Sequence, residues 1–204
     1  MKYQEYINKN EAFIFGLDEV LYPEKDYLLQ VYYLFAQFIE YGEQIEGQGI
    51  IDFMKATYEK DGPADLFNKT AVQFGLPEKY QLNYELLLQN AKLPLKLLLF
   101  APVLDFLQEV KAAGKSIFLL VEGDPAQQLN KIRQIEWNGL EKDLIVYFSA
   151  ESITGTLDET LGDILLKHEL NSEKTVLIGV DKKGENIADS RQINFLSTAK
   201  LYIP

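Results

Sequence analysis

The spacing of hydrophobic residues changes twice along the chain, and each change marks a different kind of structure. A short apolar run at 12–17 predicts a buried strand that leads into an acidic loop at 18–24. From residue 26, hydrophobic side chains recur every three or four positions, which indicates an amphipathic helix. No strand-like alternation interrupts the stretch up to residue 91, so an all-helical block is expected there. Its further helices are expected at roughly 49–60, 64–74 and 78–91, separated by helix-breaking glycine and proline residues.

Strand and helix alternate through the rest of the chain. Such alternation predicts right-handed crossovers and a parallel sheet that is covered by helices on both faces. The expected fold class is therefore α/β, with a Rossmann-like core formed by residues 1–21 and 95–204 and an all-helical insertion at 22–94 after the first strand. Strands are expected at 116–121, 144–148, 175–180 and 193–196, and helices at 103–113, 125–137, 161–170 and 186–192.

Composition narrows the classes of function. The 204 residues include 31 acidic and 20 basic side chains, a net charge of −11, which disfavours binding to nucleic acid or to anionic membranes. Cysteine is absent and His168 is the only histidine, so thiolate chemistry and zinc sites built from cysteine or several histidines are excluded. No targeting segment is recognisable at the start, and the expectation is a cytoplasmic protein whose partner is a small molecule or another protein.

Three loops that follow predicted strands carry a family resemblance. The segment FIFGLDEVLYPE at 13–24 resembles the opening motif of the haloacid dehalogenase (HAD) superfamily, Asp-x-Asp-x-Thr/Val-Leu, which is often followed by Tyr-Pro. The segments 118–129 and 178–185 are similar to the second and fourth motifs of that superfamily, and the insertion at 22–94 resembles its helical cap. The resemblance covers nearly the whole chain and implies a HAD-like hydrolase fold.

The same resemblance implies that the catalytic positions have changed. Gly16 stands where the superfamily has the aspartate nucleophile, whereas Asp18 retains the position of the general acid/base. Val121 stands at the position of the Thr or Ser that holds the transferred group, and Glu122 at that of the following Asn. A phosphoryl-transfer site needs an in-line nucleophile and stabilisation of the developing charge, so the resemblance implies loss of both.

The metal and lysine positions are altered as well. The magnesium-binding acids of the fourth motif align with Val180 and Gly184, which leaves Asp181 as the neighbouring carboxylate. The lysine of the third motif has no counterpart between Lys142 and Lys167, because that interval contains no Lys or Arg. We therefore expect a cluster of carboxylates without a cation, apart from relief by Lys182 or Lys183.

The leading hypothesis is a catalytically inactive HAD-like protein that needs no cofactor and acts by binding a ligand or a partner, with Asp18, Glu122, Lys182 and Lys183 at the ligand. One alternative is a divergent phosphohydrolase that uses Asp18 or Glu122 with Mg²⁺ held by Asp18 and Asp181. Glu122 and Asp124 are further candidates for an oxygen-ligand cation site. Another alternative is a protein-interaction module on the aromatic cap.

Several of these residues also have purely structural interpretations. Asp18 is read as a loop carboxylate that accepts backbone hydrogen bonds, and Asp124 as the N-cap of the helix that starts at Pro125. Lys182 and Lys183 are read as solvated side chains and His168 as a surface residue near a helix end. Tyr33 is expected to be the exposed member of the aromatic helix.

Overall fold

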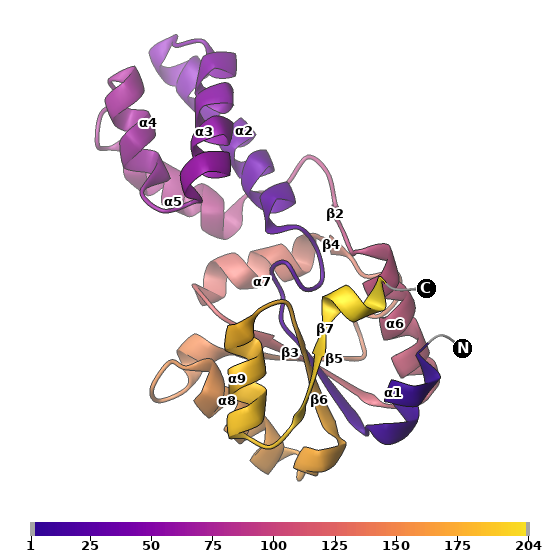
Figure 1. Ribbon diagram of the computed structural model, residues 1–204. Helices are drawn as coiled ribbons and strands as arrows, with labels where there is room; N and C mark the ends of the chain where they lie inside the picture. The colour runs from indigo at the N-terminus through magenta and orange to yellow at the C-terminus, as the bar shows by residue number, and fades with distance from the viewer. Residues whose placement is uncertain (1–2, 203–204) are drawn as a thin grey trace.

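The computed structural model describes residues 3–202 and has a central sheet of parallel strands (Figure 1). The order of the strands across the sheet is β5-β3-β1-β6-β7, so the first strand lies in the middle. All four pairings within the sheet are parallel, and the registers place Phe15 beside Leu119 on one side and Ile178 on the other. The strands are β1 (Ala12–Phe15), β3 (Ser116–Val121), β5 (Leu144–Phe148), β6 (Thr175–Gly179) and β7 (Asn194–Ser197).

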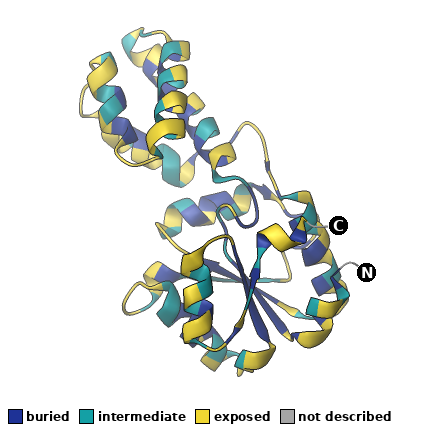
Figure 2. Ribbon diagram, viewed as in Figure 1, coloured by how far each residue is buried: buried dark blue, intermediate teal, exposed yellow. Residues whose placement is uncertain are grey.

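Helices cover both faces of this sheet because β1 is apolar on both. Phe13 and Phe15 pack into the larger hydrophobic cluster with α1 and α6, whereas Ala12 and Ile14 pack into a second cluster with α8 and α9. A strand that is buried on both faces reads as a continuous apolar run, and β1 and β6, at the centre of the sheet in Figure 2, are buried along their whole length. The core helices are α1 (Gln4–Lys9), α6 (Ala101–Ala112), α7 (Pro125–Gln134), α8 (Leu157–Lys167) and α9 (Lys182–Ser190).

A separate group of helices follows β1 and lies against α7 (Figure 1). Its interior is rich in aromatic rings: Phe35 meets Phe67 and Tyr84 edge to face at centroid distances of 6.0 and 5.3 Å. These buried side chains join the larger hydrophobic cluster of the core. The structure thus confirms the predicted fold class, a parallel α/β core with a helical segment after its first strand. The helices of that segment are α2 (Glu24–Glu43), α3 (Gly47–Asp61), α4 (Leu66–Phe74) and α5 (Tyr80–Asn90).

Several element boundaries differ from the sequence prediction. The polar start of the chain contains α1, whose single buried side chain, Ile7, gave no periodic signal. The helix predicted at 125–137 ends at Gln134, because Ile135–Glu136 forms β4 and pairs with β2, Leu97–Leu98. The helices predicted at 161–170 and 186–192 start earlier, at N-caps supplied by the Thr156 and Asp181 side chains. Short 3₁₀ helices occupy η1 (Ser149–Glu151), η2 (Ser172–Lys174) and η3 (Thr198–Leu201).

Tyr33 and His168 are both predicted to lie at the surface. Tyr33 is 45% exposed, but Tyr41 on the same helix is more exposed at 92%. His168 is half-buried at the C-terminal end of α8, where its Nε2 lies 2.8 Å from the hydroxyl of Tyr147 and its ring meets Phe118 edge to face. Among residues 3–202, no helix is both long and apolar enough to cross a membrane.

Candidate functional site

A pocket of about 270 Å³ opens at the carboxyl ends of β1, β3 and β6, where ligands commonly bind in parallel α/β sheets. Its apolar wall includes Leu120, Leu157, Leu177 and Ile187. All of its lining residues belong to the core, and none of those described comes from the helices α2 to α5. The predicted site residues that line it are Gly16, Asp18, Glu122, Asp181, Lys183 and Gly184.

Gly16 follows β1 directly and continues its pairing, since its N–H donates to the carbonyl of Ile178 at 3.2 Å. A Cβ atom placed on Gly16 would lie 2.9 Å from Cγ2 of Val20, which is closer than carbon atoms pack in proteins. Val20 is itself buried, at 4% exposure. The space that a side chain at Gly16 would enter is therefore already taken by a methyl group.

Asp18 is held by three donors. Its Oδ1 accepts a hydrogen bond from the Tyr22 hydroxyl at 2.7 Å, and its Oδ2 accepts from Nε2 of Gln128 at 2.9 Å and from Nζ of Lys131 at 2.8 Å. Only 23% of its side chain is exposed. One of the three donors is an ammonium group, so this hydrogen bond is charge-assisted. The structural interpretation of Asp18 expected donors from loop backbone amides, whereas the three donors that the structure places on it are all side chains.

Lys131 supplies the cation that the sequence analysis did not find. Its side chain is completely buried, and its Nζ lies 2.8 Å from Asp18 Oδ2 and 2.8 Å from Glu24 Oε1. The same nitrogen lies 5.4 Å from the centroid of the Tyr27 ring, which adds a cation–π contact. The expectation of carboxylates without a cation is therefore wrong for Asp18. The superfamily resemblance places the lysine of the third motif between 142 and 167, whereas Lys131 lies on α7, earlier in the chain.

Gln128 joins Asp18 to the loop after β3. Its Nε2 donates both to Asp18 and, at 2.7 Å, to the carbonyl of Glu122. Both partners are acceptors, so the amide orientation is fixed and its Oε1 points away from them. That Oε1 is buried and has no hydrogen-bond partner among the described residues. A rigid polar bridge therefore connects the loops after β1 and β3.

The phenol of Tyr22 is neutral at ordinary pH. Burial raises the pKa of Tyr22 far above its usual range, and the nearby charge of Asp18 raises it further. Tyr22 therefore acts as a hydrogen-bond donor to the carboxylate, and it holds the turn after β1 in place.

The other charged candidates pair with a neighbouring charge or cap a helix, and of these Glu122, Asp181 and Lys183 line the pocket. Lys183 binds both carboxylate oxygens of Glu122, at 2.7 and 2.6 Å, whereas Lys182 pairs with Glu185 on its own helix. The side chain of Asp124 accepts from the N–H of Gln127 at 2.8 Å and caps α7, as its structural interpretation proposed. Asp181 caps α9 by accepting from the N–H of Gly184 at 2.9 Å. Val121 is buried at the end of β3, and Val180 lines the pocket beside Asp181.

Comparison with solved structures identifies the fold. A haloacid dehalogenase-like hydrolase from Xanthomonas campestris aligns over 96% of this chain and 84% of its own, with 15% identity and a TM-score of 0.57. The chain has the haloacid dehalogenase-like fold. The L-2-haloacid dehalogenase RSc1362 aligns over 96% of this chain and 88% of its own, with 13% identity and a TM-score of 0.56. A haloacid dehalogenase-like protein from Streptococcus pneumoniae covers 93% and 85%, with 14% identity and a TM-score of 0.53.

No family model matches the sequence, and no curated protein sequence matches it significantly. At these identities the haloacid dehalogenase-like fold is shared while most side chains differ. A shared fold alone does not establish a shared reaction, which depends on the side chains of the site.

The superfamily resemblance implies a magnesium ion, but the donor set around Asp18 does not fit one. Asp18 already accepts three hydrogen bonds, while Asp181 and Asp124 each cap a helix. In the part of the chain that the structure describes, no three acidic or histidine side chains are grouped closely enough to hold a metal ion. Mg²⁺ requires near-octahedral oxygen coordination, and this arrangement does not provide it.

The sequence analysis missed Tyr22 and two α7 residues, Gln128 and Lys131, as partners of Asp18. A signal was present, because Gln128, Lys131 and Gln134 recur every three residues and thus share one face of a helix. A polar stripe on a helix that packs against the rest of the protein indicates a buried polar network. Which loop that stripe contacts depends on how α7 is docked, and this cannot be read from its spacing.

Proposed function

We propose that this protein does not hydrolyse phosphoesters and acts by binding a small ligand in the pocket beside Asp18. The observation that carries the proposal is the contact at Gly16, where the superfamily resemblance places the nucleophile. Gly16 offers no attacking atom, and Val20 fills the space into which a side chain would extend. Covalent transfer needs a nucleophile held in line with the substrate, and the residues described at this position do not provide it.

The charges around the pocket support the same proposal. Lys131 is paired with Asp18 and Glu24, and Lys183 is paired with Glu122, so each of these cations is already neutralised. A phosphate dianion entering the pocket would meet Asp18 and Asp181 and would have to break an ion pair to gain a cation. The apolar wall formed by Leu120, Leu157, Leu177 and Ile187 instead suits a small, largely apolar molecule.

The hydrolytic part of the proposal is tested by assaying a panel of phosphomonoesters and 2-haloacids with Mg²⁺. The expected result is no turnover above the level of an Asp18→Asn variant purified in the same way. Turnover by the wild-type protein that Asp18→Asn abolishes would contradict the proposal and favour a divergent hydrolase that uses Asp18.

The binding part is tested separately, by screening small apolar fragments with ligand-detected NMR. Ile187→Trp fills the pocket from α9 and is expected to abolish binding, whereas Ile153→Trp, at a position 97% exposed on a loop, should leave it unchanged. Fragments that bind the wild type and the Ile187→Trp variant equally would show that the pocket is not the binding site.

A second candidate, interaction through the helical segment, is favoured by its exposed apolar side chains. Phe38 and Leu86 both line a shallow depression between α2 and α5. Light scattering of the wild type and of a Phe38→Ser, Leu86→Ser variant tests this candidate. An assembly that the substitutions dissociate supports it, and a strict monomer over a wide concentration range counts against self-association. The exposed apolar residues of the segment are Tyr33, Phe38, Tyr41, Val72, Leu82 and Leu86.

A further inference from the structure

Asp18 lines the pocket but also belongs to a second group of charges, whose other members do not line the pocket. Two carboxylates, Asp18 from the loop after β1 and Glu24 from the first residue of α2, approach one nitrogen, and each does so at 2.8 Å. Their side chains are only 23% and 27% exposed, so water alone cannot fully screen their mutual repulsion. A cation between them relieves this repulsion.

We propose that the ammonium group of Lys131 is this built-in cation and that it excludes a divalent metal from the site. The ammonium has three N–H donors, and two of them are used by Asp18 and Glu24 while the Tyr27 ring lies beside it. A metal ion bound by the same two oxygens would have to displace it. Because Lys131 is tethered to α7, the ammonium competes at a high effective concentration and does not leave the site.

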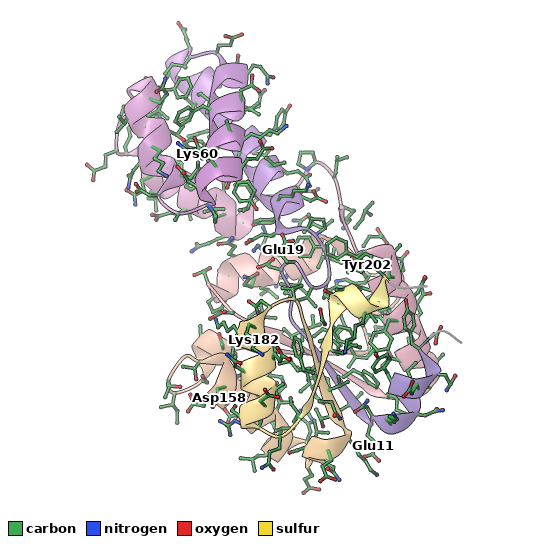
Figure 3. All side chains as sticks on the ribbon, viewed as in Figure 1. Glu11, Glu19, Lys60, Asp158, Lys182 and Tyr202 are labelled. Carbon is green, nitrogen blue, oxygen red and sulfur yellow. The ribbon has the colours of Figure 1, made fainter. Side chains whose placement is uncertain are left out.

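The built-in cation also joins two parts of the fold. Asp18 belongs to the core, Glu24 begins the helical segment, and Lys131 comes from the helix that lies between them in Figure 1. Glu19, in the loop that connects Asp18 to Glu24, is labelled at this junction in Figure 3, and its Oε1 accepts from the N–H of Glu24 at 2.9 Å. The ammonium therefore does at this junction what a bridging metal ion would do, but it does so permanently.

The experiment removes the ammonium and asks whether a metal takes its place. Lys131→Met keeps the length and bulk of the side chain without the charge, and binding is followed with Tb³⁺ luminescence, which the neighbouring Tyr22 and Tyr27 can sensitise, and with Mg²⁺ competition. The expected result is Tb³⁺ binding at least about tenfold tighter in Lys131→Met than in the wild type, at roughly millimolar affinity or better, because Asp18 and Glu24 lose the ammonium group that neutralises them. The gain should disappear in a Lys131→Met, Asp18→Asn variant, which also corrects for binding to surface acids.

Two results would overturn the proposal. One is wild-type binding of Mg²⁺ or Tb³⁺ that Asp18→Asn removes, since the ammonium would then not exclude the metal. The other is a folded Lys131→Met protein, verified by circular dichroism, with no gain in binding. Should Lys131→Met fail to fold, Lys131→Gln replaces it, because glutamine can donate to one carboxylate while leaving the charge uncompensated. Metal affinity is measured without any substrate, so the result is independent of whether the protein turns over phosphoesters.

Discussion

Gly16 and Val20 lie four residues apart, on either side of Asp18. The clash between Val20 and a side chain introduced at position 16 can be measured as a coupling energy. The backbone at Gly16 is not in the left-handed region, so alanine is compatible with its conformation but not with the 2.9 Å approach to Val20 Cγ2. We expect Gly16→Ala to lower the free energy of unfolding by about 1 to 2 kcal/mol in the wild type, the usual cost of overpacking. In a Val20→Ala background the same change should cost nothing or stabilise slightly. Urea denaturation of the four proteins yields the coupling energy.

The control for this cycle is Gly49→Ala on α3. A Cβ there would lie 3.7 Å from Cε1 of Phe74, an ordinary contact, and alanine is favoured over glycine inside a helix by up to about 1 kcal/mol. Gly49→Ala should therefore stabilise the protein. If the cost of Gly16→Ala were the same in both backgrounds, the occupied space beside Gly16 would not be the reason why a side chain is excluded there.

At the scale of elements, α7 is the helix that fastens the helical segment to the core. The Asn130 Nδ2 donates to the Tyr27 hydroxyl at 3.1 Å and to the Ala91 carbonyl at 2.9 Å, and the Tyr27 hydroxyl in turn donates to the carbonyl of Leu88. Asn130→Ala leaves these buried groups with fewer hydrogen-bond partners, which should lower the free energy of unfolding by about 1 to 3 kcal/mol. Hydrogen exchange should accelerate at the start of α2 and the end of α5, while protection in the central strands β1 and β3 is retained.

Asn186→Ala, an exposed position on α9, is the matched control and should change the free energy of unfolding by less than about 0.5 kcal/mol. If Asn130→Ala accelerated exchange equally in the sheet and in the helical segment, the two parts would unfold as one cooperative unit, and the α7 contacts would not stabilise the helical segment locally. Equal exchange rates in the wild type and in Asn130→Ala would show that these polar contacts of Asn130 do not stabilise the docking of α7 against the helical segment.

Helix α7 also shows how far the sequence determines the fold and the site. The central strands are predicted well because residues buried on both faces form uninterrupted apolar runs. On α7 the usual relation between polarity and burial is inverted: Leu129 is 37% exposed, whereas Lys131 is completely buried. Amphipathic spacing assigns such a lysine to the surface, and only the docking of α7 against the loop after β1 brings it to Asp18. Two-residue strands such as β2 and β4 carry too few positions for any periodicity to appear.

At the scale of the whole molecule, the helical segment and the core share one hydrophobic cluster, which includes several fully buried tyrosines. Burial raises the pKa of Tyr84 to about 12 and raises the pKa values of Tyr22 and Tyr32 well above their usual range. These phenols stay protonated in the folded protein under conditions in which the unfolded chain has lost their protons. The free energy of unfolding of both parts of the molecule therefore decreases as the pH becomes alkaline.

The sign and size of this linkage follow from proton counting. A group whose pKa is raised on folding contributes its full stability below the unfolded value, near pH 10 for tyrosine, and loses it as the pH rises toward the folded value. Between about pH 10 and pH 12 each of the three tyrosines should remove about 1.4 kcal/mol per pH unit, so together they lower the free energy of unfolding by about 4 kcal/mol per unit. Urea denaturation from about pH 8 to pH 11, with tyrosinate absorbance recorded in parallel, measures this slope. Tyr84→Phe should reduce the slope by about 1.4 kcal/mol per unit, and Tyr41→Phe, at a position 92% exposed, should leave it unchanged. A slope that both substitutions change equally would mean that exposed groups, and not the buried tyrosines, set the alkaline limit of the fold.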